Sequence, residues 1–295
     1  MSNDSTAPAR LTPPIGGFQM IDDRRVFVNR AGRGGPAVVF LPGASAVGLD
    51  YYGVQQGVSQ FTTAVLYDRG GTGYSDPMAL PRTATEVATE LRALLDAENI
   101  PAPYVLAAHS LGGLYAHRFT QLFPADVAGL VWLDGLHRDW DEFVPPRASL
   151  AATEHMGPDP EELARMRPAL HDIHAELLAT YPPHLREALL EAKLTEEWLR
   201  TGVAERRTLI PLAAELRTGP AIPDVPVIAL TVTGDDPDHR ELHEAKTRMD
   251  AALADSVSHG EQRVLTDTFH HRLCFDRPDA VVAAIRDVVD RAARP

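Results

Sequence analysis

One serine in this chain stands at a bend where a nucleophile could be held. Residues 104–108 form an unbroken apolar run, and a helix-like pattern resumes directly after Ser110. A chain can turn this sharply from strand to helix only if the residues two before and two after the serine are tiny, and these are Ala108 and Gly112. A serine in such a turn points its hydroxyl out of the sheet, where it can attack an acyl carbon once a base takes its proton.

Two groups of aspartates could supply the acid that supports such a base. Asp134 ends an apolar run downstream of the serine, and Asp235, Asp236 and Asp238 follow the next apolar run. Asp134 could also cap its loop, and the later aspartates surround a proline, as residues of a polar turn often do. We expect Asp134 to be the acid, because its placement is unambiguous whereas the later loop offers no clear register.

Three histidines near or downstream of the bend are expected to have structural roles. His109 lies inside the bend and is expected to support it. His171 and His174 share a helical face, but no further metal ligand lies near them and no HExxH or zinc-finger spacing occurs. We therefore expect no metal and no other cofactor.

The glycine-rich segment 68–75 (DRGGTGYS) invites comparison with nucleotide-binding loops. The dinucleotide-binding fingerprint requires GxGxxG to open a helix directly after the first strand. Here Pro77 and Pro81 precede any helical pattern. We therefore expect this segment to bind no phosphate.

Apolar runs of strand length alternate with amphipathic helical patterns at short intervals. Apolar residues at helical spacing predict a helix over 83–99, and Pro278 suits the first turn of the last helix. The alternation predicts an α/β fold with a mostly parallel sheet flanked by helices, whose chemistry gathers at the carboxyl ends of the strands. The predicted strands are 18–21 and 25–28 as an edge hairpin, then 37–41, 63–67, 104–108, 129–133, 225–233 and 263–266.

The strand pattern disappears between about residues 138 and 220. Leucine-rich, charged stretches predict helices there, over 161–170, 173–180, 185–193 and 196–200. We interpret this part as an inserted helical cap that roofs the site and shapes substrate choice. The expected organisation is a flexible N-terminal tail at 1–17, a core of 18–137 and 221–295, and a helical cap at 138–220.

The composition narrows the possible partners. The net charge of −13, with no cluster of lysine and arginine, argues against nucleic acid. The single cysteine, Cys274, cannot form an intramolecular disulfide, and the sequence shows neither a signal peptide nor an apolar run of membrane length. We expect a cytoplasmic protein with no membrane partner, and the oligomeric state stays unknown.

Four features together resemble the α/β-hydrolases that use a serine nucleophile. They are the loop that begins at Pro42, the glycine-rich segment 68–75, the bend at 108–113, and a histidine seven residues before Pro278. The resemblance covers the chain except for the tail and the cap. Two departures stand out: Ala108 replaces the first glycine of GxSxG, and Pro42 stands where family members commonly carry histidine.

The resemblance implies a Ser-His-Asp triad. The family's spacing from the last helix assigns the base to His271, and its neighbour His270 is the alternative. Asp134 resembles the position that haloalkane dehalogenases use for their acid, whereas most relatives keep the acid where Asp235 and Asp236 lie.

The resemblance also implies an oxyanion hole made of backbone N–H groups, which we expect to be those of Ala44 and Leu111. Losing one such donor costs about 3 kcal/mol of barrier in comparable sites, so the geometry of this loop matters more than its proline. Aromatic residues that could line the pocket, or simply pack, are Tyr51, Tyr52 and Trp140.

The expected function is hydrolysis of a small to medium ester, lactone or thioester, a small-molecule acyl substrate, through an acyl-serine intermediate. By resemblance to this family, dehalogenase and epoxide-hydrolase chemistry would require an aspartate as the nucleophile at the bend. The serine at that position therefore argues against both. Hydrolysis of a carbon–carbon bond, acyl transfer and cyclisation are compatible with the same triad. A non-catalytic, ligand-binding member of the fold is the alternative from a different class.

Overall fold

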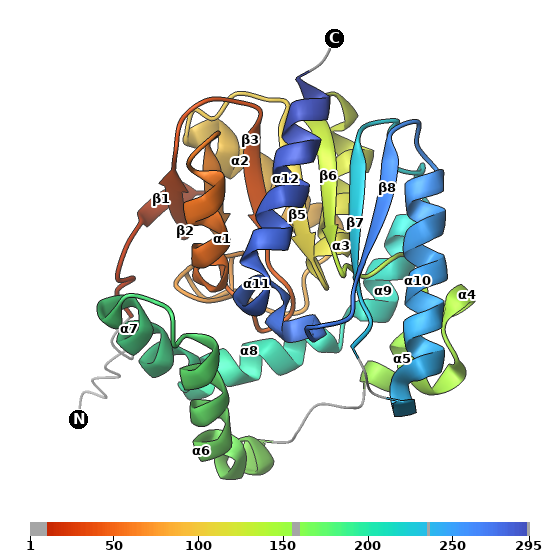
Figure 1. Ribbon diagram of the computed structural model, residues 1–295. Helices are drawn as coiled ribbons and strands as arrows, with labels where there is room; N and C mark the ends of the chain where they lie inside the picture. The colour runs from red at the N-terminus through yellow and green to blue at the C-terminus, as the bar shows by residue number, and fades with distance from the viewer. Residues whose placement is uncertain (1–10, 155–159, 235–236, 294–295) are drawn as a thin grey trace, which may run out of the picture.

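A single eight-stranded sheet organises the protein. The computed structural model describes residues 11–154, 160–234 and 237–293. The strand order is β1-β2-β4-β3-β5-β6-β7-β8; β2 pairs antiparallel with both β1 and β4, and all other neighbours are parallel (Figure 1). The strands are β1 Gly17–Ile21, β2 Arg24–Ala31, β3 Ala37–Leu41, β4 Ala64–Tyr67, β5 Tyr104–His109, β6 Val127–Leu133, β7 Val227–Val232 and β8 Gly260–Leu265.

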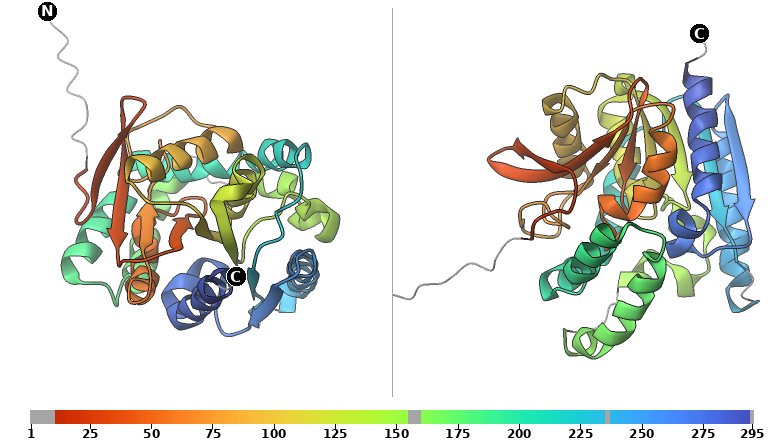
Figure 2. Two further views of the ribbon diagram at one scale, coloured as in Figure 1. Left: turned by 90° about the horizontal axis from the view of Figure 1, so that it is seen from above. Right: turned by 60° about the vertical axis from the view of Figure 1, so that its left-hand side comes forward.

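Helices cover both faces of this sheet, as Figure 2 shows from two further directions. Helices α2, α3 and α10 bury their apolar residues in one cluster, and α1, α11 and α12 bury theirs in a second cluster. These helices are α1 Tyr52–Val58, α2 Ala84–Ala97, α3 Gly112–Leu122, α10 Arg240–Asp255, α11 Leu273–Asp276 and α12 Pro278–Ala292. The predicted α/β fold, with a mostly parallel sheet between layers of helices, is confirmed.

The two central strands β3 and β5 anchor the loops that follow Leu41 and His109. Every residue of both strands is buried, which is why their sequences lack an alternation of apolar and polar residues. Each fully buried leucine or valine stabilises the fold by about 1.5–3 kcal/mol. The positions of the loops after Leu41 and His109 are therefore fixed by well-anchored strand ends.

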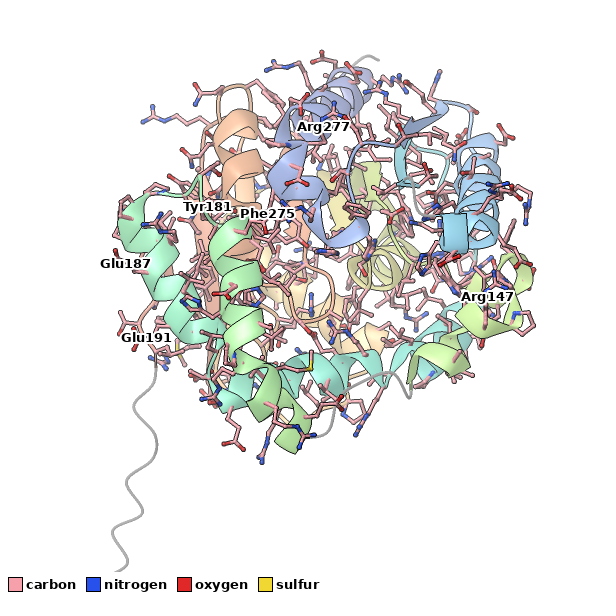
Figure 3. The ribbon with its side chains drawn as sticks, turned by 60° about the horizontal axis from the view of Figure 1, so that its bottom comes forward. Arg147, Tyr181, Glu187, Glu191, Phe275 and Arg277 are labelled. Carbon is pink, nitrogen blue, oxygen red and sulfur yellow. The ribbon has the colours of Figure 1, made fainter. Side chains whose placement is uncertain are left out.

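The stretch between β6 and β7 contains helices and no strand within its described residues. Its helices are α4 Trp140–Phe143, α5 Leu150–Glu154, α6 Pro160–Leu177, α7 Pro183–Lys193, α8 Glu196–Arg206 and α9 Leu209–Arg217. Helices α4 and α9 pack against core helices, whereas α6, α7 and α8 lie beyond the carboxyl ends of the strands (Figure 1). Figure 3 views the molecule from this side, where Tyr181 packs against Phe275 with ring centroids 6.0 Å apart. We call residues 138–220 the cap segment.

The helices differ from the prediction in several places. The stretches predicted as two helices over 161–170 and 173–180 form one helix, α6, which accommodates Pro168 in its interior. Helices α1, α4, α5, α9 and α11 were not predicted; α9 carries Pro211 in its first turn, where the missing N–H is not needed. Within the described residues, no helix combines the length and the apolar character that crossing a bilayer requires.

Candidate active site

Ser110 occupies a strained turn between β5 and α3. Its φ is +52°, in the left-handed region that residues other than glycine rarely adopt. The turn is tightly enclosed, since a Cβ atom on Gly112 would lie only 2.1 Å from the carbonyl oxygen of Leu41. Ala108 is fully buried on the other side. The small residues expected around the serine are thus required by contact with the neighbouring strand.

His270 is the histidine that contacts the acid. It is the first residue of the 3₁₀ helix η5 (His270–Arg272), and its Nδ1 lies 2.5 Å from Oδ2 of Asp134. His271 lines the same pocket without making this contact. Successive side chains of a 3₁₀ helix point about 120° apart, so only one of two adjacent histidines can face a given group. The pairing predicted for His271 is therefore corrected to His270, the alternative.

Asp134 follows the end of β6 with its side chain fully buried. Its Oδ1 accepts a hydrogen bond from the backbone N–H of Val232 at 2.9 Å. Its Oδ2, which binds His270, also accepts a hydrogen bond from Lys246 Nζ at 2.6 Å. Burial opposes ionisation of this carboxyl, but Lys246 and His270 hold its pKa well below the usual range. The carboxylate is therefore ionised at neutral pH.

Of the alternative acids, Asp238 is the one that lies within the described residues. Asp235 and Asp236 lie outside the described residues. Asp238 lies in the short 3₁₀ helix η4 (Pro237–His239) and is exposed. Among the described aspartates that follow Ser110, Asp134 is the one that His270 contacts.

Lys246 was missed by the sequence analysis. This residue of α10 is buried, and its ammonium also donates a hydrogen bond to the carbonyl oxygen of Val232 at 2.8 Å. Its neighbours on the buried face of the helix include Ala245 and Met249. A lysine within the apolar stripe of an amphipathic helix is the signal that could have revealed it, because lysine is almost never buried without a partner.

The loop after β3 leaves the backbone N–H of Ala44 without an acceptor among the described residues. The amides on either side are engaged: that of Gly43 donates to a tyrosine hydroxyl at 3.2 Å, and that of Ser45 donates to a cap-segment carboxylate at 3.0 Å. No acceptor in the described part of the chain takes the amide hydrogen of Ala44 or that of Leu111, beside Ser110. The use of these two amides as an oxyanion hole stays a prediction.

A buried ion pair fixes the backbone of the same loop. The Arg69 guanidinium donates to the carbonyl oxygens of Pro42 at 2.6 Å and Gly43 at 3.0 Å. It also pairs with Glu205 of α8 at 2.5 Å, and the two side chains are only 2% and 3% exposed. The second oxygen of Glu205 accepts the amide hydrogen of Ser45. The loop is thus held from one side by the core and from the other by the cap segment.

The glycine-rich segment 68–75 folds back on itself and binds a neighbouring loop through Asp68. The carboxylate of Asp68 accepts backbone hydrogen bonds from Gly48 at 2.7 Å and Tyr74 at 2.8 Å. Burial raises the pKa of Asp68 to about 7 despite these two donors. The glycines allow close approach: a Cβ atom on Gly73 would lie 2.2 Å from this carboxylate.

A chain of hydrogen bonds joins the loop after β3 to the loop that carries the base. The Gly43 amide donates to the Tyr51 hydroxyl, which lies 2.9 Å from Nδ1 of His109. Nε2 of His109 lies 3.0 Å from the backbone carbonyl oxygen of His270, so this nitrogen carries the proton. Burial, reinforced by the nearby His270, lowers the pKa of His109 to about 3 and keeps the ring neutral. His109 supports both loops as well as the bend.

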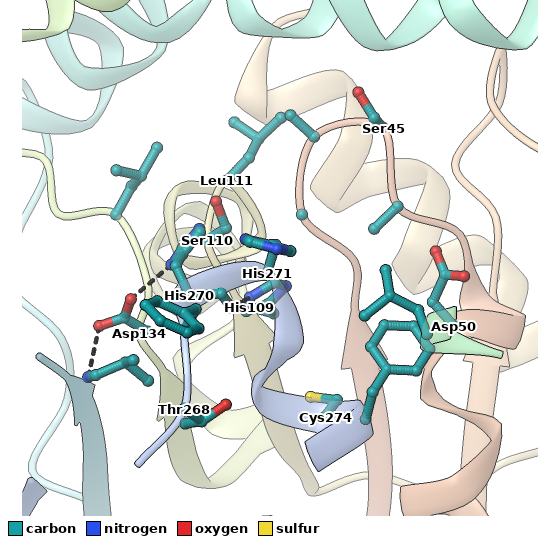
Figure 4. Close-up of a pocket in the computed structure, with 18 of the residues that line it drawn as sticks. Ser45, Asp50, His109, Ser110, Leu111, Asp134, Thr268, His270, His271 and Cys274 are labelled. Atoms are coloured by element: carbon teal, nitrogen blue, oxygen red, sulfur yellow. Dashed lines mark hydrogen bonds and ion pairs between the residues drawn. The ribbon is translucent and has the colours of Figure 1, made fainter. Parts of the chain in front are cut away.

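A cavity of about 800 Å³ lies between these loops and the cap segment. Ser110, His270 and Asp134 all line it, and Figure 4 draws them together with the contact between His270 and Asp134. Helix α6 contributes an apolar wall made of Leu170, Ile173 and Leu177. The cavity is large enough for a small-molecule ligand.

Aromatic residues singled out from the sequence have different positions. Tyr51 and Trp140 line the cavity. Tyr52 packs instead against Tyr181, with ring centroids 5.5 Å apart. Cys274 also lines the cavity, and burial raises the pKa of its thiol, so it stays protonated.

Solved structures with the same fold include both esterases and epoxide hydrolases. Cfl2 of Burkholderia cenocepacia is 22% identical with a TM-score of 0.73, over 95% of this chain and 98% of that one. A thermophilic esterase of Thermogutta terrifontis is 18% identical with a TM-score of 0.64, over 95% and 99%. The epoxide hydrolase CorEH is 17% identical with a TM-score of 0.71, over 93% and 98%. At these identities the likeness shows the fold alone.

Curated relatives match over shorter stretches. RutD of Cronobacter turicensis is 31% identical over 103 residues, which are 35% of this chain and 38% of RutD. The match to efuK of Hormonema carpetanum is 31% identical over 114 residues and spans 37% of this chain and 16% of efuK. A model described as the alpha/beta hydrolase family, by contrast, matches residues 38–284. With most of its length inside that match and the sheet described above, the chain belongs to the alpha/beta hydrolase family.

Proposed function

We propose that this protein hydrolyses carboxylic esters, including lactones or thioesters, through an acyl-serine intermediate. The proposed triad is Ser110, His270 and Asp134. The observation that carries the proposal is the 2.5 Å contact between His270 Nδ1 and the buried Asp134 carboxylate, in the pocket that also receives Ser110. Such a contact holds an imidazole in one tautomer, with Nε2 free to accept a proton.

In the proposed reaction, His270 Nε2 takes the hydroxyl proton of Ser110 as Oγ attacks the acyl carbon. The carbonyl oxygen gains negative charge, and the amides of Ala44 and Leu111 would donate to it. His270 then passes its proton to the leaving alcohol or thiol. Water, deprotonated by His270, then attacks the acyl-serine. His270 returns this proton to Oγ of Ser110 as the bond between Oγ and the acyl carbon breaks and the acid is released. Asp134 stays ionised throughout and stabilises the protonated imidazole.

The nucleophile separates this proposal from the other activity represented among the similar folds. By the same resemblance, epoxide-hydrolase chemistry would require an aspartate as the nucleophile at the bend, whereas this chain has Ser110 there. The esterase of Thermogutta terrifontis shares the fold, which supports an acyl substrate by analogy.

A fluorophosphonate probe tests the proposal, because it labels a serine only where a base activates it. We expect wild-type protein to gain one adduct by intact mass, and Ser110→Ala and His270→Gln to gain none. His271→Gln is the matched control and keeps the label. A folded wild-type protein that takes up no label, or an adduct that persists in Ser110→Ala, would contradict the proposed function.

A further inference from the structure

One cationic side chain of the pocket wall has no carboxylate partner among the described residues. Among the described lining residues, Asp50 and Asp134 are the carboxylates, and each is bound by a lysine. Lys193 lies 2.8 Å from Asp50, and Lys246 lies 2.6 Å from Asp134. Arg206 also lines the pocket, and in the described part of the chain it forms no ion pair. Its guanidinium is therefore available to a ligand.

The position of Arg206 brings this charge to the site of the proposed chemistry. Arg206 is the last residue of α8, the cap-segment helix that lies against the loop after β3. That contact is close, because a Cβ atom on Gly202 would lie 2.0 Å from Oγ of Ser45. The preceding residue, Glu205, is already bound by Arg69 and cannot neutralise Arg206 by direct pairing. The side chain of Arg206 is exposed, so a ligand in the pocket can reach it.

The net charge of the chain bears on how an anionic ligand could bind at Arg206. A protein with a net charge of −13 repels anions at long range, so an anionic ligand needs a local cation to bind. An arginine presents a planar fork of N–H donors that matches a carboxylate with two parallel hydrogen bonds. Apart from His174, the residues that α6 contributes to the wall are apolar, which suits an alkyl spacer.

We infer that Arg206 binds a carboxylate on the substrate, remote from the ester that Ser110 attacks. The preferred substrates are then monoesters of dicarboxylic acids, or esters with an equivalent distal carboxylate. This inference rests on the proposed function and adds the substrate class to it.

The test compares monomethyl and dimethyl esters of dicarboxylic acids with four to eight carbons. For wild-type protein we expect the ratio of kcat/KM for monoester over diester to exceed one and to fall as NaCl is raised from 50 to 500 mM. In Arg206→Gln the ratio falls by about tenfold, the loss expected for a charge-assisted hydrogen-bonded pair, and its salt dependence disappears. Arg206→Lys recovers part of the ratio.

Arg207→Gln is the matched control, because this adjacent arginine is exposed and does not belong to the pocket wall described above. The ratio should be unchanged in that variant. If Arg206→Gln leaves the ratio unchanged while both esters are cleaved, the inference is wrong and the proposed function stands.

A binding measurement separates the two proposals where turnover cannot. Calorimetric titration of Ser110→Ala with monomethyl suberate should show binding that weakens about tenfold when Arg206→Gln is added. If wild-type protein cleaves no ester and takes up no fluorophosphonate, the proposed function fails. Binding that ignores the Arg206 substitution overturns the inference independently of catalysis.

Discussion

Two buried ion pairs flank Ser110, and they act on the site differently. On the acid side, Lys246 donates to the same oxygen of Asp134 that contacts His270. On the opposite side, the Arg69–Glu205 pair binds backbone groups of the loop after β3. The lysine contributes a point charge beside an ionisable group, whereas the arginine fork contributes geometry.

The difference teaches which property each pair can control. Lys246 favours the ionised form of Asp134, the carboxylate that contacts His270, so it acts on the charge of the proposed triad. Arg69 and Glu205 touch no titrating group of the proposed triad; they restrain the backbone that presents Ala44. Breaking the first pair should change pH dependence, and breaking the second should change turnover.

The largest effect should come from Asp134→Asn. We predict a loss of kcat on the order of 10⁴-fold, because the amide no longer holds the required tautomer of His270. The substitution also leaves Lys246 buried without its carboxylate, which should lower the free energy of unfolding by about 3–5 kcal/mol. Ester hydrolysis and urea denaturation measure the two effects. Asp236→Asn is the control for the alternative acid, and the reverse outcome would transfer the role to that loop.

Glu205→Gln should come next. The substitution removes the negative charge that pairs with buried Arg69. It also leaves one acceptor oxygen where Arg69 and Ser45 each use their own, so the loop loses part of its restraint. We predict a fall in kcat of about 10²-fold, approaching the loss of one oxyanion donor, with a smaller change in KM.

A second buried pair provides the matched control for that experiment. Arg82 and Glu90 are 2.9 Å apart with both side chains 7% exposed, and they do not contact the loop after β3. Glu90→Gln should lower stability comparably without the fall in kcat. Equal losses of kcat in the two variants would mean that Glu205 acts through stability alone.

Lys246→Met should have a moderate effect on activity. Removing the positive charge takes away the largest influence that lowers the pKa of Asp134, so the acidic limb of the kcat/KM profile should move to higher pH. Lys246→Arg keeps the charge and should move the limb less. A limb that stays in place in Lys246→Met would show that the lysine does not influence the proposed base.

His117→Gln should leave activity at neutral pH unchanged and alter only stability. Burial, together with the nearby Arg138, lowers the pKa of His117 from 6.5 to about 4, so the unfolded chain binds more protons than the folded one between these values. The free energy of unfolding therefore falls as pH drops from 6.5 towards 4. The histidine contributes on the order of 3 kcal/mol to this fall. Urea denaturation at several pH values should show a shallower fall in the variant, and an unchanged slope would contradict this assignment.

The sequence predicted the fold well because strands and bends are encoded locally. The apolar run 104–108 and the tiny residues around Ser110 indicate the turn without reference to distant parts of the chain. The choice between His270 and His271 is different, because it depends on which way a single 3₁₀ turn faces Asp134, 136 residues away in sequence. Local spacing cannot determine that orientation.

The ion pairs were beyond prediction for the same reason. Lys246 is 112 residues from Asp134, and Glu205 is 136 residues from Arg69. A charged residue on the apolar face of a helix is a local sign that a partner exists, but it does not identify the partner. Only the assembled sheet and cap segment bring them together.

The hydrogen-bonded chain from Gly43 through Tyr51 and His109 to His270 has a consequence for how substrate choice can evolve. All four residues belong to the core, and none comes from the cap segment. These hydrogen bonds hold the loop where an oxyanion would form at a set distance from the loop where a proton would be exchanged. Mutations within 138–220 that spare Glu205, which also holds the loop after β3, can therefore reshape the pocket for a new ester while that spacing stays unchanged.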